Sequence, residues 1–235
     1  MNGYLDLSLV KKQQLYSFLS RFISENKKNK FEENILQRTR YIAVVLEDIF
    51  QPHNASAVLR SCDCFGIQDV HIIENNNKYE INPDVALGSS KWLSLFKYHK
   101  AENNTEECLQ QLKDSGYRII ATTPHKNDHT PESLPLDQKI ALVFGTELEG
   151  LTSQAIEIAD GFVKIPMYGF TESLNISVSA ALLVRSITER LHNSEIPWHL
   201  SETESLDIRI AWAKSVVKKA DLLEKEFYKK LKANK

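Results

Sequence analysis

Short apolar runs that alternate with segments of helical periodicity constrain the fold more than any other feature of this sequence. Continuous apolar runs of this length are typical of strands buried on both faces. One such continuous run lies at 41–46, and further mainly apolar stretches that predict strands lie at 70–73, 93–98, 117–122, 140–144 and 162–165. Strands alternating with helices predict an α/β fold, with a mostly parallel sheet and helices on both faces. No Gly-x-Gly-x-x-Gly follows the first run, so the usual dinucleotide-binding fingerprint is missing.

The helices expected between the strands are marked by capping residues. Asn54 is a natural N-cap for a helix that runs through Phe65, and Gly66 suits the left-handed end of that helix. Gly116 ends another helix in the same way. Further helices are expected at 105–115 and 152–159.

Both ends of the chain are expected to be helical and basic. The apolar spacing predicts helices over 5–24, near 31–39 and, as one long helix, over 206–230; Lys27, Lys28 and Lys30 are assigned to a connector. The net charge of −2 is unevenly distributed: residues 1–40 carry +4, residues 206–235 carry +5, and the middle carries −11. Two interpretations stay open: basic tails that grip a polyanion, or solvated helices whose lysines confer solubility.

Composition excludes several classes of protein. Hydrophobic residues make up 42% of the 235 residues, enough for a sizeable core, and no apolar run is long enough to cross a bilayer. The amino-terminal residues do not resemble a signal peptide. The three cysteines are too few for a disulfide framework, and no His/Cys/Asp cluster has metal-ligand spacing. These features predict a reduced, cytoplasmic protein that has no metal site and does not associate with membranes.

The stretch 161–179 holds the main candidate site. It reads as a short strand, an irregular turn with Pro166 and Gly169, and a helix capped by Ser173 or Asn175. Such a turn leaves backbone N–H and C=O groups unpaired, which allows it to bind a polar ligand. On spacing alone, an ordinary strand-to-helix connection with capping side chains is the favoured interpretation.

Three stretches in order resemble the motifs of the SpoU/TrmH family of RNA ribose 2′-O-methyltransferases, within the SPOUT superfamily. They are VLEDIFQPHNASAVLRSCDCFG at 45–66, LVFGTELEGL at 142–151 and IPMYGFTESLNISVSAAL at 165–182. The resemblance covers roughly 31–192 and is strongest to the tRNA (guanosine-2′-O) branch, because Pro-His-Asn stands where ribosomal-RNA relatives often have Pro-Gly-Asn. Gln51 departs from the pattern, since relatives usually have Asp or Asn there, and Thr171-Glu172 replace a more apolar pair.

This resemblance implies a fold and an activity. The fold is a SPOUT domain at 41–192 with a C-terminal deep trefoil knot, flanked by a helical extension at 1–40 and by a linker and basic helix at 193–235. The activity is S-adenosylmethionine-dependent 2′-O-methylation of tRNA by a homodimer, most simply at guanosine 18 of the D-loop. Two alternative functions stay open: methylation of ribosomal RNA or of another tRNA position, and RNA binding without catalysis.

The resemblance also assigns the site residues. Arg60 is the catalytic residue near the ribose 2′-hydroxyl; since arginine stays protonated, binding the neighbouring phosphate suits it better than simple base catalysis. The proton acceptor, phosphate or Arg60, is left open. Four more residues shape the catalytic site: Asn54, Glu147, Ser173 and Asn175. The residues expected to hold S-adenosylmethionine are Thr122, Gly145, Ile165 and Leu174.

Overall fold

A computed structural model describes residues 4–79, 88–101, 103–124, 126 and 128–233. The chain divides into two compact units. One unit, the sheet unit, comprises Thr39–Trp198, and the other, the terminal unit, combines Met1–Arg38 with His199–Lys235. Helices from the two ends of the chain therefore share one unit. The sheet unit carries 13 basic and 21 acidic residues, and the terminal unit carries 16 and 10.

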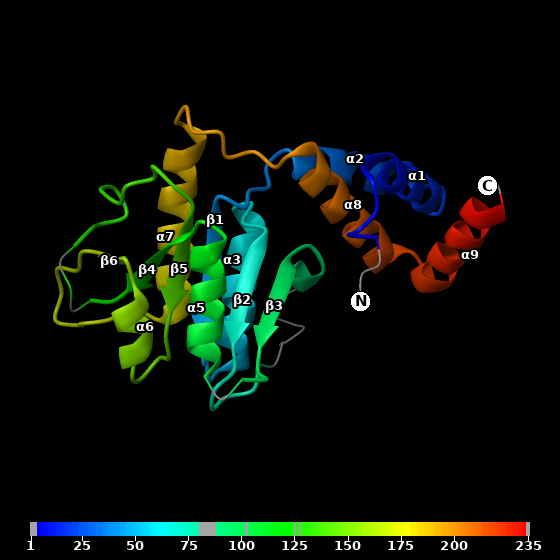
Figure 1. Cartoon of the computed structure of the whole chain (residues 1–235). Coiled ribbons are helices and arrows are strands. Elements are labelled where there is room, and N and C mark those ends of the chain that lie inside the picture. The colour runs from blue at the N-terminus through cyan, green and yellow to red at the C-terminus, as the bar shows by residue number, and fades with distance from the viewer. Residues whose placement is uncertain (1–3, 80–87, 102, 125, 127, 234–235) are drawn as a thin grey trace. The chain divides into compact units, whose positions relative to one another are not determined.

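The sheet unit contains a six-stranded, all-parallel sheet (Figure 1). Its strands are β1 Ile42–Glu47, β2 Asp69–Ile73, β3 Ser94–Tyr98, β4 Arg118–Thr122, β5 Ile140–Phe144 and β6 Gly161–Val163. The strand order is β3-β2-β1-β5-β4-β6. The prediction of a mostly parallel sheet is confirmed, and each predicted apolar run contains one strand or most of one.

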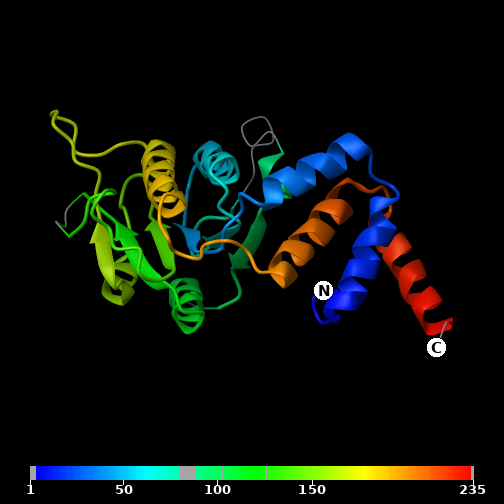
Figure 2. The same ribbon diagram turned by 90° about the horizontal axis from the view of Figure 1, so that it is seen from above.

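Helices cover both faces of this sheet, as Figure 2 shows from above. Helices α3 (Pro52–Cys64) and α7 (Ile176–His192) lie on one face, and α5 (Asn104–Asp114) and the short α6 (Ser153–Ile158) lie on the other. Side chains alternate along a strand. Ile42, Val44 and Leu46 of β1 therefore pack toward α3 and α7, while Ala43 and Val45 pack toward α5. The continuous apolar runs arise because both faces are buried.

The start of α3 differs from the prediction. The helix begins at Pro52, with Gln51 at the N-cap, so the assignment of Asn54 as the cap is wrong. Proline suits the first helical position, because its φ is already helical and its missing N–H is not needed there. Asn54 lies in the first turn, is 3% exposed, and its side chain is available for other bonds. The left-handed Gly66 after the helix is confirmed, with φ of 77°.

The terminal unit consists of α1 Leu9–Ser20, α2 Glu25–Ile35, α8 Glu202–Val216 and α9 Ala220–Ala233. The single helix predicted over 206–230 is wrong, since the chain turns between α8 and α9 with Lys219 at φ 57°. Lys27, Lys28 and Lys30 lie in α2 rather than in a connector. Leu15 and Leu19 of α1 are fully buried in this unit.

Two further findings concern membranes and thiols. Within the described ranges, no helix has the length and apolarity that a bilayer crossing requires. Cys62 and Cys108 are buried, Cys64 is exposed, and none of the three forms a disulfide.

Candidate active site

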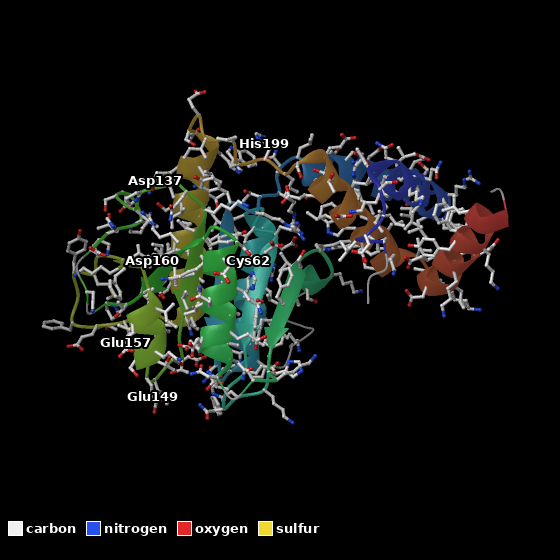
Figure 3. All side chains as sticks on the ribbon, in the orientation of Figure 1. Cys62, Asp137, Glu149, Glu157, Asp160 and His199 are labelled. Carbon is white, nitrogen blue, oxygen red and sulfur yellow. The ribbon has the colours of Figure 1, made fainter. Side chains whose placement is uncertain are left out.

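A cavity of about 470 Å³ opens at the carboxyl ends of β4, β5 and β6. In parallel sheets this edge is the usual place for a ligand. The arrows of β2 and β3 point toward the carboxyl edge of this parallel sheet (Figure 1). In Figure 3, Glu149, which lines the cavity, lies beyond that edge. All four residues predicted to hold a cofactor line the cavity: Thr122, Gly145, Ile165 and Leu174. Three of the five predicted catalytic residues line it as well: Glu147, Ser173 and Asn175.

One wall of the cavity is a loop that folds back on itself after β5. Thr146 and Gly150 exchange backbone hydrogen bonds of 2.8 and 3.2 Å, and Gly150 has φ of 72°. A Cβ on Gly145 would lie 2.1 Å from the carbonyl oxygen of Gly150, so only glycine fits there. The loop therefore brings the backbone of Gly145 directly to the cavity and carries Glu147 at its rim.

The opposite wall is the turn that leads into α7. Asn175 caps this helix, because its Oδ1 accepts hydrogen bonds from the Ser177 backbone N–H at 2.8 Å and from Ser177 Oγ at 2.6 Å. Of the two predicted capping residues, Ser173 and Asn175, the structure shows Asn175 in that position. Ser173 is exposed at the cavity and does not cap the helix.

Asn54 joins the two walls. Its Nδ2 donates to Glu147 Oε1 at 2.7 Å, and its Oδ1 accepts from Asn175 Nδ2 at 3.2 Å. Asn54 does not itself line the cavity and lies buried behind these two residues. The three sequence motifs thus meet through direct hydrogen bonds between residues 93 and 121 positions apart.

Arg60 stands apart from this cluster. It lies on the exposed face of α3, outside the set of cavity residues, and its side chain forms no hydrogen bond or ion pair with a described residue. An exposed arginine whose donors are used by no described residue is suited to bind a phosphate in fork geometry. The structure therefore brings four of the five predicted catalytic residues together and leaves Arg60 to face solvent.

The chemistry of the cavity favours a ligand with an apolar part and a positive charge. Its walls include Leu151, Ile156, Ile165, Met167 and Leu174, while the charged groups that line it are Glu147, Glu149, Glu172 and Lys164. No histidine is among the described lining residues, so imidazole base catalysis has no candidate in them. Burial lowers the pKa of His71 to about 4, and this ring bonds to Tyr98 within the core.

Sequence reasoning missed two buried acids at the end of β1. Glu47 is 1% exposed and accepts hydrogen bonds from the Thr105 and Thr152 hydroxyls, both at 2.7 Å, and from the Thr152 N–H. Asp48, at φ 56°, accepts from the backbone N–H groups of residues 75, 76 and 77. Together they fix the loops at the carboxyl edge of the sheet. The sequence signal that could have identified Glu47 and Asp48 is the presence of two acidic residues directly after an apolar run.

Comparison with known proteins shows the family and the fold to which this chain is similar. The model of the SpoU rRNA Methylase family matches residues 41–185. The tRNA (guanosine(18)-2′-O)-methyltransferase of Borreliella burgdorferi is 44% identical over 88% of this chain and 93% of its own. A crystal structure of the Aquifex aeolicus TrmH/SpoU tRNA modifying enzyme superposes with a TM-score of 0.72 at 29% identity, covering 83% of this chain and 98% of that one. The SpoU methyltransferase AviRb of Streptomyces viridochromogenes, crystallised with AdoMet, shares the fold at 18% identity and a TM-score of 0.56, over 69% and 62% of the two chains.

Proposed function

This chain belongs to the SpoU rRNA Methylase family, and we propose that it methylates the ribose 2′-oxygen of guanosine 18 in tRNA, with S-adenosylmethionine as the methyl donor. The observation that carries this proposal is the 44%-identical relative, which is named for that reaction and matches nearly the full length of both chains. The clustering of Asn54, Glu147 and Asn175 beside a cavity supports an active enzyme rather than a binding module.

The cavity suits S-adenosylmethionine in size and in chemistry. Its volume falls in the range of ligand pockets, about 300–1,000 Å³. Ile165 and Leu174 would pack on the adenosine, with the main chain at Gly145 and Thr122 close by. The carboxylates at the cavity rim complement a cation. When bound, the cofactor supplies a methyl group on a sulfonium that leaves as a neutral thioether, so the transfer needs no metal.

The remaining residues orient the RNA. Arg60 binds the phosphate beside the target ribose, and the proton of the 2′-hydroxyl passes either to that phosphate or to Arg60 after Arg60 has transiently given up a proton to the phosphate. Glu147 and Asn175 are held by Asn54 at the cavity, and Ser173 faces the same space. These groups fix the position of the ribose oxygen; in a reaction between two bound partners, such positioning lowers the barrier.

A deep trefoil knot around α7 is part of the proposal. The connection between β4 and β5 is bound to α7 by Arg190, which donates to the Pro131 and Leu134 carbonyls at 2.6 and 2.8 Å. Leu134 is fully buried in the core that contains α7. A loop held so tightly to the helix that follows β6 supports the threading that the family resemblance implies.

We expect a homodimer that buries the exposed apolar face of α7. Val178 and Leu182 are 45% and 47% exposed one turn apart, and Arg60 lies outside the cavity of its own chain, as in a site shared between copies. Leu182→Glu should place a charge in that interface, yield monomers by sedimentation at micromolar concentration, and abolish methylation. Leu36→Glu, at a side chain that is 64% exposed and does not line the cavity, is the matched surface change. Full methylation by a monomeric wild-type protein would contradict the dimer.

The proposed activity is tested on tRNA transcripts that differ at one atom. Wild-type protein with labelled S-adenosylmethionine should add one methyl group per tRNA, and none when residue 18 carries a 2′-deoxyribose. Label that persists on the deoxy transcript would indicate another tRNA position, and label on ribosomal RNA alone would indicate the ribosomal alternative. A wild-type protein that binds tRNA but not S-adenosylmethionine would favour a non-catalytic RNA-binding protein.

A further inference from the structure

We infer that Gln51 is a positioning residue for the reaction, because it holds the Asn54 side chain in one orientation; this inference rests on the proposed function. Gln51 Oε1 accepts a hydrogen bond from Asn54 Nδ2 at 3.2 Å, and Glu147 Oε1 accepts from the same nitrogen at 2.7 Å. A primary amide has two N–H donors, so both donors of Asn54 are used. Asn54 therefore donates nothing to the RNA or the cofactor and acts only through its neighbours.

The direction of the hydrogen bonds is fixed along the whole cluster. An ionised carboxylate only accepts, so Glu147 forces the nitrogen of Asn54 toward itself and the oxygen toward Asn175. Asn175 then donates through Nδ2 and keeps Oδ1 for Ser177 at the start of α7. A flipped Asn54 amide would place its oxygen against the Glu147 carboxylate and its NH2 group against the Asn175 NH2 group, so neither hydrogen bond could form. In the observed orientation Gln51 supplies a second acceptor on the nitrogen side, so both N–H donors of Asn54 are occupied.

The position of Gln51 supports a use other than capping. Gln51 occupies the N-cap of α3 with extended backbone, φ −93° and ψ 116°, yet its side chain makes no capping hydrogen bond. Short side chains such as Ser, Thr, Asp and Asn are preferred there because they reach the first free N–H groups. Glutamine is too long for that geometry and instead reaches Asn54. The Gln51 side chain therefore does not stabilise the start of α3 as a cap, and it fixes the Asn54 amide in position instead.

Two variants of similar size test this role. Gln51→Met keeps the length and removes the acceptor, while Gln51→Glu keeps an acceptor oxygen. We expect Gln51→Met to lower kcat about 5- to 10-fold, roughly the factor carried by one hydrogen bond between neutral groups. The KM for tRNA and the dissociation constant for S-adenosylmethionine should stay within about twofold, because Gln51 does not line the cavity. Gln51→Glu should restore kcat to within about twofold of wild type.

The control is Gln138→Met, the same substitution at an exposed glutamine outside the cavity. Melting temperatures of all three variants should match that of wild type, since Gln51 is only partly buried. Wild-type kcat in Gln51→Met, or an equally low kcat in Gln51→Glu, would overturn the inference, as would a change confined to KM. Failure of the proposed function itself would appear differently, as a wild-type protein that methylates no RNA.

Discussion

Replacement of Arg60 by lysine is expected to lower methylation turnover by about 100-fold or more while leaving the fold and S-adenosylmethionine binding intact. Lysine keeps the positive charge but is a point charge, without the planar fork that pairs with two phosphate oxygens. A positioned group that assists proton transfer contributes about 10²–10⁴-fold to a rate. The measurement is single-turnover transfer of labelled methyl to tRNA at saturating protein.

The structure predicts that this variant folds normally. Arg60 is exposed and its side chain bonds to no described residue, and surface changes of that kind usually alter stability by less than about 0.5 kcal/mol. Arg21→Lys is the matched control, at an exposed arginine that does not line the cavity. If Arg60→Lys retains more than half of the wild-type turnover, Arg60 is not the catalytic residue.

The parallel sheet could be predicted from the sequence, but the order of the strands within it could not. A strand that is covered on both faces leaves a local mark in the sequence, because most of its positions must be apolar. The order β3-β2-β1-β5-β4-β6 leaves no such mark, since it depends on how the connections cross the sheet. For the same reason, the sequence pattern could not predict which residues would lie together at the cofactor site. Only the family resemblance predicted that Thr122 and Leu174 line one cavity.

The role of Asn54 shows why local patterns mislead at a site. Spacing favoured an N-cap, yet Pro52 starts the helix two residues earlier and places Asn54 inside the first turn. Its partners, Glu147 and Asn175, lie 93 and 121 residues away, beyond the reach of any window on the sequence. The capping partner of Asn175 is only two residues away, so a local pattern could narrow the cap of α7 to Ser173 or Asn175.

The turn between α8 and α9 was missed for a different reason. No Gly or Pro marks it, and Lys219 adopts the left-handed conformation, which costs a non-glycine residue about 1–2 kcal/mol. Tertiary contacts offset that cost: Val217 and Ala220 are each 7% exposed. Lys214 of α8 also pairs with Glu224 of α9 at 2.6 Å. A straight helix satisfies the sequence pattern but forms none of these contacts.

The second large effect is expected in tRNA binding by the terminal unit, which carries an excess of six positive charges. Lys218, Lys225 and Lys229 are exposed and form no ion pair with a described residue; Lys225 and Lys229 lie one turn apart on α9. Cations of this kind bind phosphates and release counterions, so affinity falls as salt rises. Reversing all three to glutamate should reduce the slope of log affinity against log salt by about 2–3. At 0.1 M salt the affinity should fall about 100-fold.

Charge reversal is preferable to truncation, because deleting residues 1–30 would remove Leu15 and Leu19 from the core of this unit. The matched control is the triple change of Lys218, Lys225 and Lys229 to arginine, which keeps the charge and should keep both affinity and slope. S-adenosylmethionine affinity should be the same in both triple variants, because none of the three lysines lines the cavity. Wild-type tRNA affinity in the glutamate variant would show that this face of α9 is a solvated surface and that tRNA is held elsewhere.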